Sequence, residues 1–372
     1  MLNNNYSLDF YYPLFSSCIP HVGFNRTLLV DTNRKQVHYI PNSLFKILNL
    51  SKKKTLKEIL SQFSNEDQGI ILEYFEYLIQ NEFVTPLKKD DLKRFPPMSL
   101  EWDYPTHCSN AIIDIVNEDA FSIFDAINKL VQINCFHIQV RFFKTIDINH
   151  FEKIISFLNH SDIYTFNICT NKITNDVLFY KKCIESNWKL SKLEIYNWEK
   201  EFVGITDAVN SQIYFYKREL SDSTQCGIVD PKYFSHEIES ITESIHFNSC
   251  LNRKLCIDQN GYVKNCPSMT QHFGHISERN LEEVIHSQEF QKLWFINKDQ
   301  IDVCQDCEFR YICPDCRCFI QDENDIYSQP AKCKYNPYIC KWEGEEEYIS
   351  VSEWRAQNPK WNKRKKTKKV EK

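Results

Sequence analysis

The chain has 372 residues, which predicts two or three domains, and its hydrophobic content of 42% is enough to build cores. The net charge of −5 gives no general field for nucleic acid, and no run of about 18 apolar residues predicts a membrane span. None of the seven glycines lies between Gly69 and Gly204, and no P-loop or dinucleotide-binding glycine motif can be found.

The first 95 residues combine short strand patterns with helical stripes. The expected elements are strands at 26–30 and 36–40, helices at 56–63 and 71–79, and a returning strand at 82–85. Together they predict a winged-helix-like unit over residues 1–95. This unit resembles the PqqD-like leader-recognition element of peptide-modifying enzymes, which implies that an extended peptide binds beside a sheet edge. An ordinary packing subdomain is the alternative.

Cys18 and His21 lie three residues apart in the same unit. This spacing would suit half of a metal-binding pair, but no second pair follows nearby. We therefore expect a core cysteine and a surface histidine.

Residues 96–235 carry a longer series of strand patterns with helical stripes between them. The expected strands are 110–116, 136–143, 163–168, 193–196 and 213–216, with helices near 121–130 and 154–158. The first strands recur at the length of one βα unit, so the fold class is α/β. The segment predicts a partial βα barrel with right-handed crossovers.

Charged residues end or follow the predicted strands. Asp114 and Arg141 belong to adjacent strands, and Glu194 could join them from a later one. Sites are built at this face of a barrel, so the cluster could bind a peptide carboxylate. A structural ion pair is the alternative. His137 alternates with apolar neighbours, and we expect it to be a hydrogen-bonded or surface histidine.

Ten of the sixteen cysteines fall within 250–340. They are Cys250, Cys256, Cys266, Cys304, Cys307, Cys313, Cys316, Cys318, Cys333 and Cys340. Disulfides are typical of small domains in oxidising compartments, and no apolar secretory segment follows Met1. We therefore expect reduced thiols, a cytoplasmic location and a bound metal, either zinc or iron–sulfur clusters.

One hairpin is predicted inside this stretch. Asn260-Gly261 favours a two-residue turn, because both central positions of such a turn have positive φ. The turn would bring Cys256 and Cys266 to the same open end, so two thiolates would face one site. A helix is expected at 280–295.

Two Cys-x2-Cys pairs follow the predicted helix, with Cys304 and Cys307 in one pair and Cys313 and Cys316 in the other. Each pair can place two sulfurs on one metal. A single zinc knuckle would use four of the ten cysteines and leave six over, whereas two four-sulfur clusters would use eight.

The whole pattern resembles the SPASM domain, which is found at the end of peptide-modifying radical SAM enzymes. The resemblance implies a domain over residues 236–345 that holds two [4Fe–4S] clusters. By order, the first cluster would take Cys250, Cys256, Cys266 and Cys316, and the second would take Cys304, Cys307, Cys313 and Cys333. Cys318 is an alternate for Cys316 because the gap after Cys313 departs from the family pattern, and Cys340 is an alternate for Cys333.

The barrel segment lacks the radical SAM motif Cys-x3-Cys-x2-Cys. Its cysteines, Cys108, Cys135, Cys169 and Cys183, are spaced too widely to form that motif, and no Gly-Gly pair occurs anywhere in the chain. Without three thiolates to hold the iron that binds SAM, we expect no SAM cleavage. We therefore expect a degenerate barrel.

A SPASM pattern on such a barrel, with Cys-Glu-Phe-Arg-Tyr-Ile-Cys-Pro-Asp-Cys-Arg at 307–317, resembles the SPASM-domain peptide maturase of grasp-with-spasm systems. The segments 41–44, 99–103 and 110–115 extend the likeness over most of the chain. The resemblance implies two partners, an ATP-grasp ligase and a ribosomally made precursor peptide. A zinc-stabilised, non-catalytic peptide-binding adaptor and an electron-transfer protein are the alternatives. The basic segment 346–372 is expected to be disordered.

Overall fold

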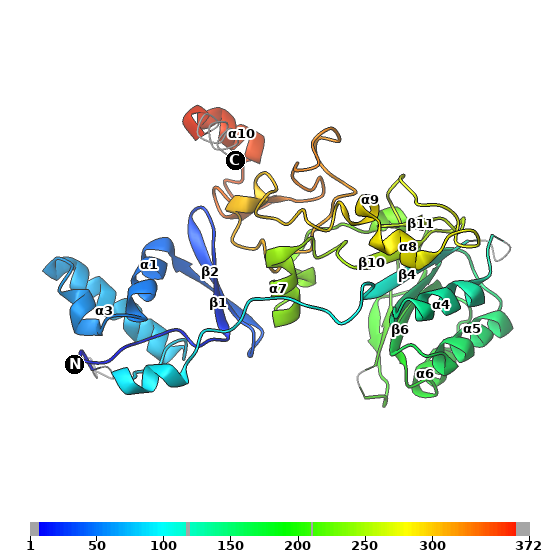
Figure 1. The fold of residues 1–372 in the computed structure, drawn as a ribbon, viewed down its shortest axis with the longest axis horizontal. Helices are drawn as coiled ribbons and strands as arrows, with labels where there is room; N and C mark the ends of the chain where they lie inside the picture. Colours follow the sequence, from blue (N-terminus) through cyan, green and yellow to red (C-terminus); the bar gives the residue numbers. More distant parts are fainter. Residues whose placement is uncertain (1–6, 117–119, 210, 362–372) are drawn as a thin grey trace.

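The computed structural model describes residues 7–116, 120–209 and 211–361 and has a mixed α/β fold. The N-terminal unit and a large sheet lie at opposite ends of the molecule, and the cysteine-rich segment extends from the large sheet towards the N-terminal unit (Figure 1). In the described ranges, no helix combines the length and the apolar character that crossing a membrane requires.

The N-terminal unit is a small antiparallel sheet followed by three helices. Its elements are β1 (Cys18–Val22), β2 (Arg26–Asp31), β3 (Gln36–Pro41), α1 (Asn42–Ser51), α2 (Leu56–Leu60) and α3 (Asn65–Gln80). The sheet has the order β1-β2-β3. Thr55 and Glu58 form a reciprocal capping box at the start of α2, and the Ser64 side chain caps α3, so local sequence sets where both helices begin.

Two features of this unit differ from the prediction. β1 and α1 were not expected, whereas the predicted returning strand at 82–85 is wrong. Glu82 has a left-handed φ of 53° and ends the helical segment, and Val84 then forms only an isolated bridge with Leu14. A 3₁₀ helix, Lys89–Arg94, follows.

Each face of the N-terminal sheet contributes residues to a hydrophobic core. Leu29 and Ile40 face a core formed with the helices α1–α3. Leu28 and Val30 belong to a second core, which includes Phe309 and other residues of the cysteine-rich segment. The small sheet therefore connects its own helices to the C-terminal part of the chain.

The large sheet has eight strands in the order β11-β10-β4-β5-β6-β7-β9-β8. They are β4 (Asn110–Ile115), β5 (His137–Phe142), β6 (Thr165–Asn171), β7 (Leu190–Tyr196), β8 (Phe202–Gly204), β9 (Gln212–Phe215), β10 (Lys254–Ile257) and β11 (Val263–Lys264). The six central strands are parallel, and the edge strands β8 and β11 are antiparallel to their neighbours. The connecting helices α4 (Ile123–Gln132), α5 (Ile148–His160) and α6 (Val177–Glu185) cover one face of the sheet (Figure 1).

The cysteine-rich segment is part of this sheet. β10 lies parallel to β4, with Cys256 opposite Ile112, and β11 folds back on β10. A domain boundary between residues 235 and 236 therefore cuts through one continuous sheet. The prediction of a two-residue turn at Asn260-Gly261 is also wrong. Such a turn needs positive φ at both residues, but of the two only Gly261 has it, at 81°. The Asp258 carboxylate instead accepts hydrogen bonds from the backbone N–H groups of Asn260 and Tyr262.

The remaining elements are short. They are α7 (Ile238–His246), α8 (Leu281–His286), α9 (Gln288–Gln291), β12 (Tyr335–Asn336), β13 (Lys341–Trp342), α10 (Val351–Gln357) and the 3₁₀ helices Ser223–Gln225, Pro231–Tyr233 and Cys304–Asp306. The helix predicted at 280–295 is broken at Ser287, whose hydroxyl accepts from the backbone of Phe290 and starts α9.

The prediction of disorder over 346–372 is wrong as far as residue 361. α10 forms there, and Arg355 makes a two-pronged ion pair with Asp302 at 2.8 Å. Trp354 stacks on Tyr338 with ring centroids 4.2 Å apart. These contacts hold the helix against the cysteine-rich segment, and residues 362–372 lie outside the described residues.

Candidate functional site

Four cysteines line one pocket in the C-terminal part of the chain. They are Cys304, Cys307, Cys313 and Cys333, here called the second thiol group. Apolar side chains, including Phe234, Phe309 and Trp342, form much of the remaining wall. All sixteen cysteines of the chain are free of disulfides. The structure thus gathers the four thiols that the sequence pattern assigned to a second cluster, although the ligand assignment itself stays a prediction.

Tight local turns bring these thiols together. The backbone N–H of Cys307 donates to the carbonyl of Cys304 at 3.0 Å, and that of Cys313 donates to Phe309 at 2.9 Å. Val303, just before the group, has a left-handed φ of 66°, which turns the chain into the pocket. Short spacing in the sequence therefore becomes short distance in space.

A buried cation lies beside the second thiol group. Lys298 is 3% exposed, and its Nζ donates to the carbonyls of Cys313 and Pro314, both at 2.9 Å. Burial lowers the pKa of Lys298, but its interactions with Cys313, Asp315 and Cys304 raise it above its ordinary value. In the part of the chain that the structure describes, Lys298 forms no ion pair with a carboxylate. The buried carboxylate of Asp315 raises the pKa of Lys298 from farther away, and thiolates would add negative charge in direct reach of the lysine.

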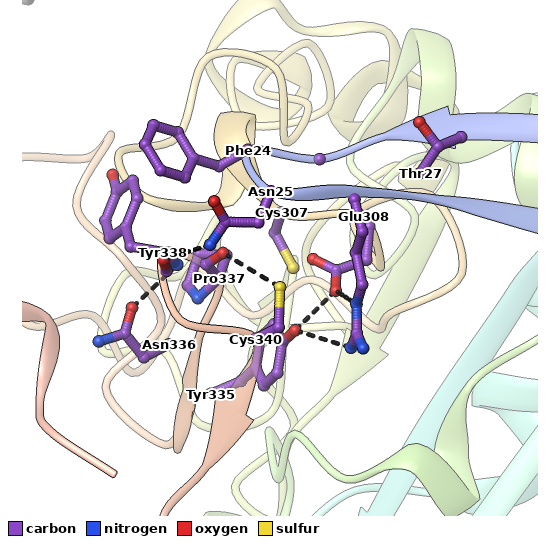
Figure 2. A network of polar contacts seen from close by, with 12 residues as sticks. Phe24, Asn25, Thr27, Cys307, Glu308, Tyr335, Asn336, Pro337, Tyr338 and Cys340 are labelled. Carbon is purple, nitrogen blue, oxygen red and sulfur yellow. Dashed lines mark hydrogen bonds and ion pairs between the residues drawn. The ribbon is translucent and has the colours of Figure 1, made fainter. Parts of the chain in front are cut away.

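Cys340, the alternate for Cys333, is not part of the pocket wall. Its thiol donates to the carbonyl of Pro337 at 3.7 Å and lies in a polar network near Glu308 and Tyr335 (Figure 2). Burial raises the pKa of this thiol. The structure therefore separates the two alternates, with Cys333 at the pocket and Cys340 outside it.

The polar network joins the second thiol group to the N-terminal sheet. Glu308, directly after Cys307, is fully buried and accepts from the Arg26 Nε and the Tyr335 hydroxyl, each at 2.6 Å. Gly23, before the β1–β2 turn, has no room for a side chain, because an added Cβ would lie 2.9 Å from the Glu308 Cβ. The turn and the thiol segment are therefore in direct contact.

His21, on β1, faces the same segment. It is 1% exposed, which contradicts the expected surface histidine, and neither ring nitrogen has a hydrogen-bond partner among the described residues. Its ring packs edge-on against Tyr311 at 5.1 Å. Burial and the nearby charge of Arg310 lower the pKa of His21 to about 3, so the ring is neutral at pH 7.

A further set of thiols gathers where the cysteine-rich segment meets the large sheet. This first thiol group consists of Cys226, Cys250, Cys266, Cys316 and Cys318. Cys266 lies near Cys226, which lowers the pKa of its thiol, and near Cys318, which together with burial raises that pKa to about 12. Burial and then the charge of Cys316 raise the pKa of the Cys250 thiol to about 12, although part of Cys250 lies at the surface.

Raised thiol pKa values have a consequence for metal binding. Burial is the main cause for Cys304, Cys313 and Cys316, and their thiols are protonated at neutral pH in the metal-free chain. A metal must therefore displace protons as it binds, which makes its affinity depend on pH. Within the described ranges, no three His, Cys, Asp or Glu side chains are grouped as ligands of a single metal ion.

Cys226 was not predicted as a site residue. It lies 24 positions before Cys250, and the chain near it carries no metal-binding spacing. The nearby thiol of Cys266, followed by burial, is the main cause of its raised thiol pKa. Only the tertiary fold brings it to the other thiols.

Cys256 has a different environment from the one predicted. It is a buried residue of β10, on the same sheet face as Asp114, two residues beyond its partner Ile112. Burial is the main cause of its raised thiol pKa, and the charges of Asp114 and Arg141 act on it more strongly than Cys266 does.

Asp114 and Arg141 form a buried, two-pronged ion pair at 2.7 and 2.8 Å. This arrangement matches the structural alternative, since each oxygen of the carboxylate already accepts from the guanidinium. Glu194 does not join them among the described contacts: it accepts from the Cys169 thiol at 3.1 Å and from the Tyr216 hydroxyl at 3.3 Å. His137 is hydrogen-bonded to Thr165 at 2.8 Å.

The two edges of the N-terminal sheet differ in their free backbone groups. Along an antiparallel strand, backbone groups point alternately towards the neighbouring strand and away from it. Ser17 bonds to Thr32 and Gly23 bonds to Arg26 across β1 and β2, so the backbone N–H and C=O groups of residues 18, 20 and 22 point away from β2. The N–H of Cys18 donates to Phe15, Pro20 has no N–H, and the carbonyl of Val22 accepts from Arg310. The β1 edge is therefore occupied.

By the same alternation, the backbone N–H and C=O groups of Val37 and Tyr39 in β3 point away from β2, towards the open edge of the sheet. Neither residue's backbone N–H has a hydrogen-bond partner among the described residues. The Tyr77 hydroxyl of α3 reaches the ring of His38 at 3.4 Å on one side of this edge, and Lys35 pairs with Glu237 at 2.6 Å near its start. The edge of β3 can thus accept an added strand.

Comparison with known proteins supports one part of the chain most directly. Residues 249–308 match the family model of SPASM, an iron–sulfur cluster-binding domain. This match begins one residue before Cys250 and ends just after Cys307, so it includes thiols of both groups. No curated protein matched the chain.

Solved structures similar to the chain include Streptococcus suis SuiB. The complex with precursor peptide SuiA has 10% identity and a TM-score of 0.28, and the complex with S-adenosylmethionine has 9% identity and a TM-score of 0.29. Each alignment covers 84% of this chain and 95% of the SuiB chain. Likeness at this level carries no argument about shared activity.

Proposed function

We propose that this chain is an iron–sulfur protein of ribosomal peptide maturation that holds two [4Fe–4S] clusters. The observation that carries the proposal is the second thiol group, in which four free thiols line one largely apolar pocket beside the buried cation Lys298. Four thiolates are the usual ligands of such a cluster, and their negative charge would offset the lysine.

The proposed ligands start from the sequence pattern. Cys304, Cys307, Cys313 and Cys333 would hold the second cluster, with Cys340 as the alternate for Cys333. For the first cluster the pattern gives Cys250, Cys256, Cys266 and Cys316, with Cys318 as the alternate for Cys316, but Cys256 lies outside the first thiol group. When bound, the clusters would tie distant segments together and could exchange electrons. Free thiols in this number fit the reducing conditions of the cytoplasm.

Metal analysis of the anaerobically purified chain tests this proposal. We expect a brown protein with about eight irons and an equal amount of acid-labile sulfide per chain. One or two zinc ions per chain with little iron would instead support a zinc-stabilised, non-catalytic adaptor. The measurement therefore separates the two functions without an activity assay.

We further propose that the open edge of β3 binds the leader of a precursor peptide as an added strand. The outward N–H groups of Val37 and Tyr39 support this, because backbone hydrogen bonds would give affinity and the flanking side chains would give selection. The occupied edge of β1 leaves β3 as the available side of the described sheet.

Calorimetry of the full chain with the peptide encoded beside its gene tests leader binding. Proline should be placed at successive positions of the leader. At every second position the leader N–H would bond to the β3 edge, and proline there should weaken the affinity by about tenfold because it has no N–H. In the protein, Val37→Pro removes an outward donor and should also weaken binding, with unfolding measurements to verify the fold. Equal affinity for all leader variants would exclude strand addition.

The partner proposed for the modification itself is an ATP-grasp ligase. The chain lacks the three-cysteine motif needed to hold a SAM-binding cluster, so we propose no SAM cleavage by this protein. Formation of 5′-deoxyadenosine above a protein-free control would contradict this. Co-purification with a ligase encoded nearby, and its loss when the leader-binding edge is altered, would support the partnership.

A further inference from the structure

Cys226 is held firmly in place although it lies in a loop. The loop follows the large sheet and precedes α7, and the Nζ of Lys332 donates to the carbonyls of Thr224 at 2.6 Å and Cys226 at 2.7 Å. On the other side, the Cys226 thiol lies 3.4 Å from the Ser268 hydroxyl, which itself donates to the carbonyl of Ser223 at 2.7 Å. Two segments of the cysteine-rich stretch therefore fix this loop.

The loop meets the first thiol group at two points. Cys266 is the neighbour that raises the pKa of the Cys226 thiol most, so the two thiols lie close together. The next residue, Gly227, has a φ of +77°, and a Cβ added to it would lie 2.9 Å from the sulfur of Cys316. Only glycine fits such an approach without displacing the sulfur. Cys226 thus lies between two proposed ligands that come from different parts of the chain.

Cys256 lacks this arrangement. Its side chain shares a face of the large sheet with Asp114, whose carboxylate is already paired with Arg141. Burial is the main cause of the raised pKa of the Cys256 thiol, and the charges of Asp114, which raises that pKa, and Arg141, which lowers it, act on it more strongly than Cys266 does. Of the two cysteines that could complete the first site, Cys226 is the one surrounded by other thiols.

We propose that Cys226, together with Cys250, Cys266 and Cys316, completes the four-thiolate ligand set of the first cluster, in the place that the sequence pattern gives to Cys256. The inference rests on the proposed function, because it concerns a ligand of a cluster named there. Each of the four thiols would lose its proton as its sulfur binds iron. The first cluster would then join the loop before α7 to the cysteine-rich segment.

Iron and sulfide content, with electron paramagnetic resonance of the dithionite-reduced full chain, tests this ligand set. Cys226→Ala should lose about four of about eight irons and the same signal that Cys266→Ala loses, while Cys256→Ala should keep both. Cys183→Ala is the matched control, because Cys183 is a buried cysteine of α6 outside both thiol groups. Full iron in Cys226→Ala, or loss of the first signal in Cys256→Ala, would overturn the inference.

The second cluster serves as an internal control for folding. If Cys226→Ala keeps the signal that Cys307→Ala loses, the chain is folded and the loss is local to the first site. Loss of both signals would show that Cys226 is a folding residue and would overturn the inference. Iron missing from the wild-type chain refutes the proposed function and this inference together, whereas full iron in wild type and Cys226→Ala alike refutes the inference alone.

Discussion

The two thiol groups are built in different ways. The second group comes from residues 304–333, and three of its four members lie within ten positions of one another. The first group draws on thiols from residue 226 to residue 318 and lies against the large sheet. One is therefore organised by local turns and the other by the tertiary fold, so the two should respond differently to substitution.

Removing one thiol from each group should have the largest effect. Cys307→Ala and Cys266→Ala should each lose about half of about eight irons, because each cluster needs four thiolates. Cys307→Ala should lose the second cluster and Cys266→Ala the first. Iron analysis combined with paramagnetic resonance would distinguish the two losses. If both variants lost the same signal, Cys307 and Cys266 would bind one cluster, and the division into two thiol groups would be wrong.

The alternate ligands Cys340 and Cys318 can be tested by the same measurements. Cys333→Ala should lose the second signal, whereas Cys340→Ala should keep it, because Cys340 lies outside the pocket wall. The reverse result would reassign the ligand. In the first group, whichever of Cys316→Ala and Cys318→Ala loses the signal of the first cluster identifies the ligand at that position.

The next largest effect should come from the ion pair that joins the second group to the N-terminal sheet. Glu308→Ala leaves Arg26 and the Tyr335 hydroxyl without their shared acceptor and should cost about 3 kcal/mol of unfolding free energy. Asp207→Ala, which removes the exposed pair with Lys181, should cost under about 0.5 kcal/mol. Denaturant unfolding measures both, and equal costs would mean that the junction is not stabilising.

Lys298 should affect the second group alone. Lys298→Met removes a buried positive charge beside the second thiol group and should lower the reduction potential of that cluster by on the order of 100 mV. The first cluster should be unchanged, because Lys298 is hydrogen-bonded within the second group. Redox titration of the full chain measures both potentials, and equal shifts would show that the two sites share one environment.

The effect that is smallest at neutral pH should be the pH dependence due to His21. Its pKa is lowered to about 3 in the folded chain, so below a pH of about 6.5 the unfolded chain binds a proton that the folded chain does not. Stability should therefore fall by about 1.4 kcal/mol per unit as the pH drops from about 6.5 towards 3. His21→Phe should remove this slope, as unfolding at several pH values would reveal. An unchanged slope would mean that His21 is not the titrating group.

The sequence predicted the parts of the molecule that local pattern determines. Strands β2 and β3 and the parallel series β4–β7 follow from hydrophobic alternation. The second thiol group follows from spacing, because three of its members are separated by single turns. β1 was missed because Pro20 and the polar His21 weaken its strand pattern, and their burial depends on Tyr311, about 290 positions away.

The first thiol group could be predicted only in part. The hairpin argument places Cys256 and Cys266 at the same open end, and their assignment as ligands stays a prediction. It did not predict that pairing with β4 puts Cys256 on the same sheet face as Asp114, which acts on the Cys256 thiol more strongly than Cys266 does. Cys226 had no local signal, since the loop that carries it is positioned by Lys332 and by the close approach at Gly227.

The tip of the first hairpin has a consequence for the order in which the chain folds. Phe24 packs edge-on against Tyr338, Trp354 and Trp361, with ring centroids 5.0 to 5.6 Å apart. During synthesis the hairpin leaves the ribosome more than 300 residues before these partners, so its aromatic tip is not fully covered until α10 and Trp361 emerge. A chain that stops before α10 would keep the contact of Phe24 with Tyr338 but lose those with Trp354 and Trp361, so such truncations would expose part of Phe24 and aggregate more readily.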